Sequence, residues 1–358
     1  MKQMEDKSMK KVTKIIFIIF AVLVVLGVAA GLFAWNYYKE GIAPVSDKSK
    51  EVIVMVENGQ TATSVLYTLE EAGLVNDVLC GKVYLKLNNV GNLQANSYIL
   101  NENMSLEEIF QIMANPTGDH VLKFSVTILD GYSLKDISES IAKALEIEAT
   151  EVMNLLNDKE FLNSLIEKYW FITDEILADG IKYPLEGYLY PETYLYNSNV
   201  TLKDVIYGSL DMMDKYLTKA KDSFEGRGWT AHEFLTFASI VERESLFDED
   251  RPKIAGVFMN RLEKNMLLQS DITVNYAWDR TGVDVLYSHL EIDSPYNTYK
   301  YAGLPIGPIS TVSGVTLDAC VNYEENEYYY FFAKEDGTVL YSKTLNEHNN
   351  TVKKNKWY

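Results

Sequence analysis

The sequence predicts an α+β protein that is carried on one membrane-spanning helix. Three observations lead to this fold class: a long uncharged segment near the N-terminus, helical periodicity over most of the remaining chain, and short alternating or aromatic segments that end at turn signals. The 358 residues suffice for about two domains. With 47% hydrophobic and 23% charged residues, the chain can bury a sizeable core and lies outside the disordered class.

The first expected element is the apolar segment over residues 15–38, which contains no charged side chain. As a helix it would be about 36 Å long, enough to cross a hydrocarbon core of about 30 Å. Trp35, Tyr37 and Tyr38 at its far end are typical of an interfacial aromatic belt. The alternative is a cleaved signal peptide, whose apolar core is usually only about 7–15 residues long. We therefore expect a single-pass helix in the cell membrane.

Charge predicts the orientation of this helix and excludes one class of partner. Residues 1–14 contain five lysines, so the positive-inside rule predicts a cytoplasmic tail over 1–14 and an extracytoplasmic remainder. The whole chain has 33 basic and 51 acidic residues, a net charge of −18. Nucleic acid is excluded as the main partner, because phosphate binding needs a basic face.

No pattern in the sequence indicates a cofactor. Cys80 and Cys320 are too few for a disulfide scaffold or a four-cysteine zinc site. The four histidines are scattered and form no HExxH motif, and no glycine-rich nucleotide-binding motif occurs. We therefore expect neither a metal nor an organic cofactor.

Beyond a linker over 39–50, the same order of elements occurs twice. A strand over 51–57, an Asn-Gly turn and a helix over 61–72 come first; a strand over 123–129, an Asp-Gly turn and a helix over 133–145 follow. A short helix over 105–114 lies between them, with a capping box at its start. The segment 51–118 resembles a LysM-type carbohydrate-binding module, and a purely structural subdomain is the alternative.

Residues 119–358 are predicted to form a larger, mostly helical domain. Its one expected antiparallel element is a hairpin of the aromatic segments 327–334 and 337–341, because an Asp-Gly pair joins them.

Residues 230–245 are the most informative for chemistry. Thr230 and Glu233 form a capping box that predicts where a helix begins. On a helical wheel, Glu242 and Glu244 lie about 80° to either side of the apolar stripe. Burial at such an edge would raise the pKa of a carboxyl towards the range of a general acid. Periodicity does not distinguish the two glutamates, and both could instead be solvated surface groups.

Polar residues and rigid loops follow this helix. Arg261 lies on the apolar stripe of the next helix, where an arginine is seldom buried without a partner. The loops over 294–299 and 302–308 are rich in Tyr, Asn, Gly and Pro. Such loops could present amides and aromatic faces to a sugar, or they could be ordinary surface turns.

Seven ordered blocks carry a family resemblance. They are LEGYLYPETY (185–194), ASIVERE (238–244), VFMNRL (257–262), LQSD (268–271), SPYNTY (294–299), GLPIGPI (303–309) and EHN (347–349). In this order they resemble the membrane-anchored endolytic murein transglycosylases, the YceG-like (MltG) family, over nearly all of the chain from about residue 51. The chain departs from the family pattern at Ile272, in place of a usual proline, and in GLPIGPI and ILDG (128–131), which alters loop stiffness.

The resemblance implies cleavage of the β-1,4 bond between N-acetylmuramic acid and N-acetylglucosamine in peptidoglycan, with formation of a 1,6-anhydro end. It implies that Glu242 is the acid and base. It also implies substrate contacts by Glu186, Tyr188, Tyr190, Asn260, Arg261, Gln269, Asp271, Thr273, Tyr296, Asn297, Thr298, Tyr299, Gly303, Leu304 and Pro305. Penicillin-binding proteins and the elongation machinery are the implied protein partners.

Two other functions stay open. One is a hydrolase with two carboxylates, Glu242 together with Asp271 or Glu186. The other is a catalytically silent scaffold that binds peptidoglycan glycan strands.

Overall fold

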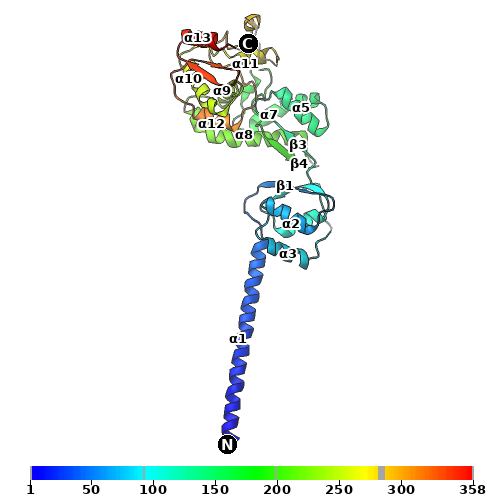
Figure 1. Ribbon diagram of the computed structural model, residues 1–358. Coiled ribbons are helices and arrows are strands. Elements are labelled where there is room, and N and C mark those ends of the chain that lie inside the picture. Colours follow the sequence, from blue (N-terminus) through cyan, green and yellow to red (C-terminus); the bar gives the residue numbers. More distant parts are fainter. Residues whose placement is uncertain (1, 92, 198–199, 281–286, 357–358) are drawn as a thin grey trace. The chain divides into compact units, whose positions relative to one another are not determined.

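The computed structural model describes residues 2–91, 93–197, 200–280 and 287–356, and it combines helices with short strands (Figure 1). The chain divides into two compact units, one formed by residues 1–123 with 195–199 and the other by 124–194 with 200–358. Within the described ranges, the strands form two-stranded sheets, β1 with β2, β3 with β4 and β5 with β6. The predicted mixture of helix and sheet is therefore confirmed.

The first unit begins with one long helix, α1 (Lys2–Ile42). Its part from Val22 to Ile42 is long and apolar enough to cross a membrane, a property that a signal sequence near the N-terminus would share. The helix continues past residue 38 into the segment predicted as a linker. The rest of that segment is held to the unit by the Ser46 amide, which donates to the Glu102 carbonyl, and by an ion pair of Lys50 with Glu102.

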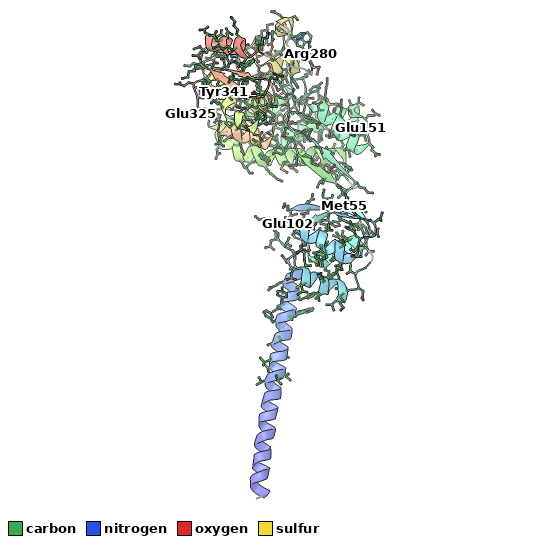
Figure 2. The ribbon with its side chains drawn as sticks, in the orientation of Figure 1. Met55, Glu102, Glu151, Arg280, Glu325 and Tyr341 are labelled. Carbon is green, nitrogen blue, oxygen red and sulfur yellow. The ribbon has the colours of Figure 1, made fainter. Side chains whose placement is uncertain are left out.

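The remaining elements of this unit form one small core. They are β1 (Glu51–Val56), α2 (Ala62–Glu71), α3 (Val78–Leu87), β2 (Asn96–Asn101) and α4 (Leu106–Ala114). Strands β1 and β2 pair antiparallel, with Glu51 opposite Asn101. Val54 and Val56 point into the core while Met55 between them is exposed (Figure 2). This alternation allowed β1 to be predicted from the sequence. Helix α3 and strand β2 were not predicted.

The second unit is mostly helical. Its elements are β3 (Phe124–Thr127), α5 (Leu134–Leu145), α6 (Ala149–Leu156), α7 (Lys159–Lys168), the 3₁₀ turn η1 (Asp174–Leu177), β4 (Thr193–Tyr196), α8 (Leu202–Glu225), α9 (Ala231–Glu244), η2 (Asp248–Asp250), α10 (Arg251–Glu263), α11 (Asp271–Ala277), η3 (Tyr287–Glu291), α12 (Gly314–Val321), β5 (Tyr330–Ala333), β6 (Val339–Ser342) and α13 (Leu345–Asn355). The predicted hairpin is confirmed: β5 and β6 are antiparallel, with Tyr330 opposite Ser342.

Helix α9 is the centre of this unit and packs against α8, α10, α11 and α12. Its predicted start is confirmed, because Thr230 and Glu233 form the capping box. Burial extends around nearly the whole helix rather than along one stripe. Two buried hydroxyl groups of α9 form hydrogen bonds within the helix: Thr236 donates to the carbonyl of His232, and Ser239 donates to that of Thr236. At the C-terminal end of α9, Glu242 and Glu244 accept hydrogen bonds from other segments of the chain.

Candidate active site

Glu242 is buried in a closed network at the C-terminal end of α9. Its residue exposure is 6%. Arg251 Nη1 donates to Oε1 at 2.8 Å, and the Ser313 amide and hydroxyl both donate to Oε2, at 2.9 and 2.8 Å. The same arginine nitrogen donates to Thr316 Oγ1 at 2.6 Å. Glu242 thus joins α9 to α10 and to the N-terminus of α12, where an anion is favoured by the helix dipole.

Glu244 lies at the same end of α9 but has a different hydrogen-bond partner from Glu242. Its Oε1 accepts a 2.6 Å hydrogen bond from Ser270 Oγ, and the residue keeps part of its surface exposed. Burial of the carboxyl raises the pKa of Glu244 to about 7, and the negative charge of Asp271 acts in the same direction. The hydrogen bond from Ser270 and the charges of Arg261 and Arg243 act in the opposite direction. This carboxyl can therefore hold or release a proton near neutral pH.

The segment around Ser270 is fixed by buried hydroxyl groups. The Ser270 amide donates to Thr298 Oγ1 at 3.0 Å, and Thr273 Oγ1 donates to the Ser270 carbonyl at 2.8 Å. Next to them, the hydroxyl of Tyr299 donates to Asp271 Oδ1. Asp271 is exposed and Tyr299 is partly exposed. The segments LQSD and SPYNTY thus meet beside Glu244 and present polar groups to solvent.

Arg261 has the partner that its place on the apolar stripe required. Its guanidinium donates to the carbonyls of Tyr329 and Leu268, both at 2.6 Å, and its charge lies near Glu244. The exposed Gln269 lies in the same segment, where its backbone N–H donates to the Thr298 carbonyl. The structure therefore gathers six of the predicted contact residues around Glu244: Arg261, Gln269, Asp271, Thr273, Thr298 and Tyr299.

The other predicted contact residues lie elsewhere. Asn260 donates to the carbonyls of Asn326 and Tyr328, both at 2.9 Å, and so holds the segment before β5. The buried Asn297 donates to the carbonyls of Leu290 and Ile292. Tyr190 stacks on Tyr216, with ring centroids 4.3 Å apart. These side chains shape the fold around the loops.

Glu186 and Tyr188, also predicted contacts, are buried. Glu186 accepts from the Leu134 amide at 2.8 Å and from the Tyr276 hydroxyl at 3.0 Å. Burial raises the pKa of Glu186 to about 8. Tyr276 packs on the ring of buried Tyr296, another predicted contact. Glu186 therefore secures the start of α5 rather than facing Glu244.

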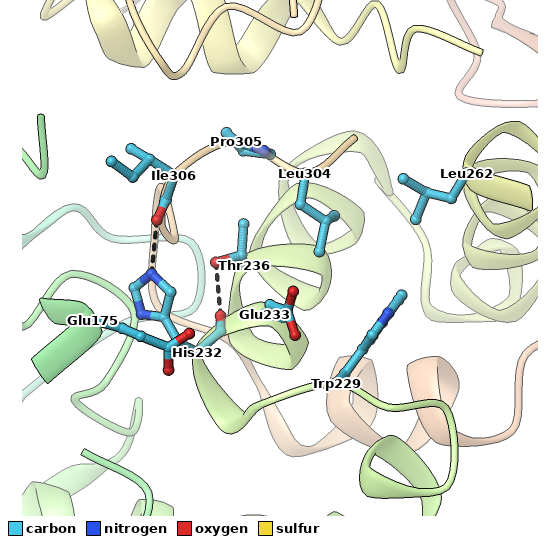
Figure 3. A pocket seen from close by; sticks show the side chains of 9 residues that line it. All are labelled: Glu175, Trp229, His232, Glu233, Thr236, Leu262, Leu304, Pro305 and Ile306. Carbon is cyan, nitrogen blue, oxygen red and sulfur yellow. Dashed lines mark hydrogen bonds between the residues drawn. The ribbon is translucent and has the colours of Figure 1, made fainter. Parts of the chain in front are cut away.

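Tyr188 belongs to a chain of hydrogen bonds at the N-terminal end of α9. His232 Nε2 lies 2.7 Å from the Ile306 carbonyl, so it must donate, and Nδ1 lies 2.8 Å from the Tyr188 hydroxyl. His232 lines a cavity of about 390 Å³, and Figure 3 shows the side chains that surround it. Its lining includes Leu304 and Pro305, which follow Gly303 in the predicted sugar loop. Glu233, also in the lining, starts α9, about 16 Å along the helix from Glu244.

Sequence reasoning weighed Glu244 but did not place it in the site, and it omitted Ser270 and Arg251. Ser270 lies inside the LQSD block, so the block itself was the available signal. In the part of the chain that the structure describes, no group of three His, Cys, Asp or Glu side chains is arranged to hold a metal.

Comparison with known proteins places this arrangement in a family. The model of the YceG-like family matches residues 54–354. The chain belongs to the YceG-like family. The family match spans both units and contains every residue around Glu244, and it confirms the resemblance drawn from the seven blocks.

Three relatives show how far the similarity extends. The endolytic murein transglycosylase of Bacillus subtilis is 34% identical over 324 residues, which cover 90% of this chain and 89% of that protein. The endolytic murein transglycosylase of Streptococcus pneumoniae serotype 2 is 31% identical over 90% of this chain, which spans 62% of the pneumococcal protein. A crystal structure of a putative YceG-like protein from Listeria monocytogenes is 36% identical, with a TM-score of 0.62 over 85% of this chain and 100% of that one.

Proposed function

We propose that this chain is an endolytic murein transglycosylase that cleaves the β-1,4 bond between N-acetylmuramic acid and N-acetylglucosamine. Membership of the YceG-like family and the names of its relatives support this reaction class. The observation that carries the mechanism is the environment of Glu244: a partly exposed residue whose buried carboxyl has a pKa raised to about 7 and accepts a hydrogen bond from Ser270.

Glu244 is the acid and base in this proposal, and Glu242, which the sequence resemblance implies, is the alternative that the test below distinguishes from it. A group that gives up a proton and later takes one back works best with a pKa near the working pH. Glu242 instead accepts hydrogen bonds from three donors, one of them on a buried arginine, and these fix it between α9, α10 and α12.

The reaction needs only one such group. Protonated Glu244 gives its proton to the glycosidic oxygen as the bond from that oxygen to the anomeric carbon of the muramic acid breaks. The 6-hydroxyl of the same sugar attacks the anomeric carbon, and its proton passes to the Glu244 carboxylate. The products are a 1,6-anhydro end and a free 4-hydroxyl, and no water is consumed. Because the nucleophile is part of the sugar, proximity replaces a second carboxylate.

The surrounding groups support these steps. Ser270 fixes the orientation of the Glu244 carboxyl, and Arg261 holds the backbone of the segment before Ser270. Asp271, with Tyr299 donating to it, disfavours a second negative charge at Glu244 and so favours the acid form. The exposed Gln269 and partly exposed Tyr299 are suited to contact sugar hydroxyls and ring faces.

The proposal includes anchoring by α1, with residues 1–14 in the cytoplasm and the rest outside the cell membrane. Support comes from the length and apolar character of α1 and from the lysines that precede it. Penicillin-binding proteins and elongation machinery remain proposed partners on the family resemblance alone.

A second role is proposed for the first unit, as a LysM-like glycan-binding module. A hollow of about 530 Å³ lies between the start of α2 and the end of α3. Its lining includes the polar side chains of Gln60, Thr61 and Thr63. Such a set can hydrogen-bond sugar hydroxyls.

The test is product analysis with the full-length chain on uncross-linked glycan strands. We expect products one water lighter than reducing-end products. Glu244→Gln should abolish cleavage while the chain stays folded, and Glu242→Gln should retain cleavage once its lower stability is allowed for. The reverse pattern would favour Glu242. Products carrying an added water would indicate a two-carboxylate hydrolase, and cellular function that survives Glu244→Gln would indicate a silent scaffold.

A further inference from the structure

Helix α3 is fastened to the last turns of α1. The Tyr37 hydroxyl donates to Asp77 Oδ2 at 2.6 Å, and Asp77 is the N-cap of α3. A Cβ atom on Gly41 would lie 2.5 Å from Cys80 Sγ, so the missing side chain of Gly41 lets the two helices touch. Figure 1 shows α3 at the end of the first unit from which α1 extends. The start of α3 therefore lies level with Tyr37, in the predicted aromatic belt.

The outer face of α3 carries a stripe of large apolar side chains. Leu79, Val83 and Leu87 are four residues apart and 66%, 41% and 66% exposed. They span about 80° of the helix, because residues four apart advance by about 40°. Tyr84 and Leu85 on the opposite face are buried in the core of the unit. Among the residues that the structure describes, none covers the stripe, and a contiguous exposed apolar surface of this kind marks an interaction site.

Two lysines border the stripe on one side. Lys82 and Lys86 are exposed and lie about 60° and 20° from Leu79 on the helical wheel. Lys82 Nζ donates to the hydroxyl of Tyr67 at 2.6 Å, which places its charge at the surface of the unit. In a chain with net charge −18, two cations next to three apolar side chains form a distinct surface. Interfacial helices combine these features, with lysines toward phosphates and an apolar face toward acyl chains.

We propose that α3 lies in the headgroup region of the membrane that α1 spans, with its apolar stripe facing the lipid. The occupant is the bilayer surface because the start of α3, with Leu79 two residues after Asp77, is fastened to the last turns of the apolar helix α1. Trp35 and Tyr37 are exposed at the same level of α1, and the lysine side complements anionic lipid phosphates. The inference rests on the proposed anchoring by α1, and it adds a second contact between this unit and the membrane.

The test uses the full-length chain in vesicles of phosphatidylcholine and phosphatidylglycerol that contain a lipid-attached fluorescence quencher. A polarity-sensitive fluorophore is attached at Leu87→Cys on α3, at Glu70→Cys on the exposed side of α2, or at Val25→Cys within α1. Cys80 and Cys320 are buried, so the parent chain measures background labelling. We expect strong quenching at positions 25 and 87, and little at position 70. Lys82→Gln with Lys86→Gln should reduce quenching at position 87 at least twofold.

The outcomes separate this inference from the anchor. Quenching at position 25 without quenching at position 87 overturns the inference and leaves the anchor in place. No quenching at position 25 overturns anchoring, and the inference falls with it. Cross-linking between position 87 of two chains, without lipid quenching there, would identify a second copy as the occupant and overturn the membrane contact. Circular dichroism of each labelled chain verifies that the helices are retained.

Discussion

Glu242 and Glu244 stand two residues apart on α9 and end in opposite electrostatic surroundings. Glu242 lies 2.8 Å from Arg251 Nη1, whereas Glu244 accepts its hydrogen bond from the uncharged Ser270 and lies close to the negative charge of Asp271. The first environment is a buried ion pair, and the second raises the pKa of Glu244 and so keeps its proton available. One helix end thus supplies both a structural anion and a candidate acid.

The hydrogen bond from Ser270 should set the pH range of activity. It favours charged Glu244, so Ser270→Ala should raise the pKa of Glu244 above its present value of about 7. Since the acid step needs the protonated form, the fall of kcat/KM at alkaline pH should move to higher pH in the variant. Cleavage rates from pH 5 to 9 measure this shift. Ser164→Ala, on α7, is the control, and an unmoved profile in Ser270→Ala would contradict the role of Ser270.

The ion pair of Glu242 with Arg251 should matter for stability. Arg251→Met leaves a buried carboxylate without its cation, which typically costs about 3–5 kcal/mol of unfolding free energy. Adding Glu242→Gln removes the unpaired charge. The double variant should therefore lose less unfolding free energy than the sum of the losses in the two single variants. Urea denaturation followed by tryptophan fluorescence measures the cycle. The exposed Lys264→Met should change stability by less than about 0.5 kcal/mol; additive losses would show that the pair is not coupled.

Glu186 should make the protein less stable at alkaline pH. Its pKa is raised to about 8 in the folded chain and is near 4.3 when unfolded. Stability is therefore lost as pH rises from about 4.3 to about 8, by up to about 1.4 kcal/mol per pH unit. Glu186→Gln removes this loss, so its stability relative to the parent should rise between pH 5 and pH 8. Urea denaturation at several pH values tests this, with the exposed Glu139→Gln as control. A constant difference would refute it.

Close packing of α1 on α3 should depend on Gly41. An added Cβ would lie 2.5 Å from Cys80 Sγ and 2.6 Å from its Cβ, so Gly41→Ala must separate the helices. We expect faster alkylation of the buried Cys80 thiol, by about tenfold or more. Gly31→Ala on the same helix meets no atom within 4 Å and is the matched control. Equal alkylation rates in the two variants would show that the contact is loose.

Elements with strong local signals could be predicted from the sequence. The capping box of Thr230 and Glu233 gave the start of α9, and the Asp-Gly pair gave the hairpin of β5 and β6. Helix α3 could not be found in this way. It carries Gly81 in its interior and apolar residues both in the core and on the exposed face, so it lacks the polar face by which amphipathic helices are recognised.

The candidate site was predictable in composition but not in the roles of its residues. Helical periodicity places Glu242 and Glu244 at the edges of one stripe, yet their partners come from distant segments. Ser313 is 71 residues from Glu242 along the chain, and Ser270 is 26 residues from Glu244. The pKa of a carboxyl depends on such tertiary neighbours, so the sequence left the choice between the two glutamates open.

The unbroken passage of α1 into its contact with α3 has a mechanical consequence. A helix that ends in a flexible tether lets the domain beyond it rotate freely, but α1 contacts α3 directly through Tyr37, Gly41 and Asp77. With α1 in a bilayer, the hollow between α2 and α3 would stay at one height above the lipid. A glycan strand bound in this hollow would therefore be held at a constant distance from the membrane.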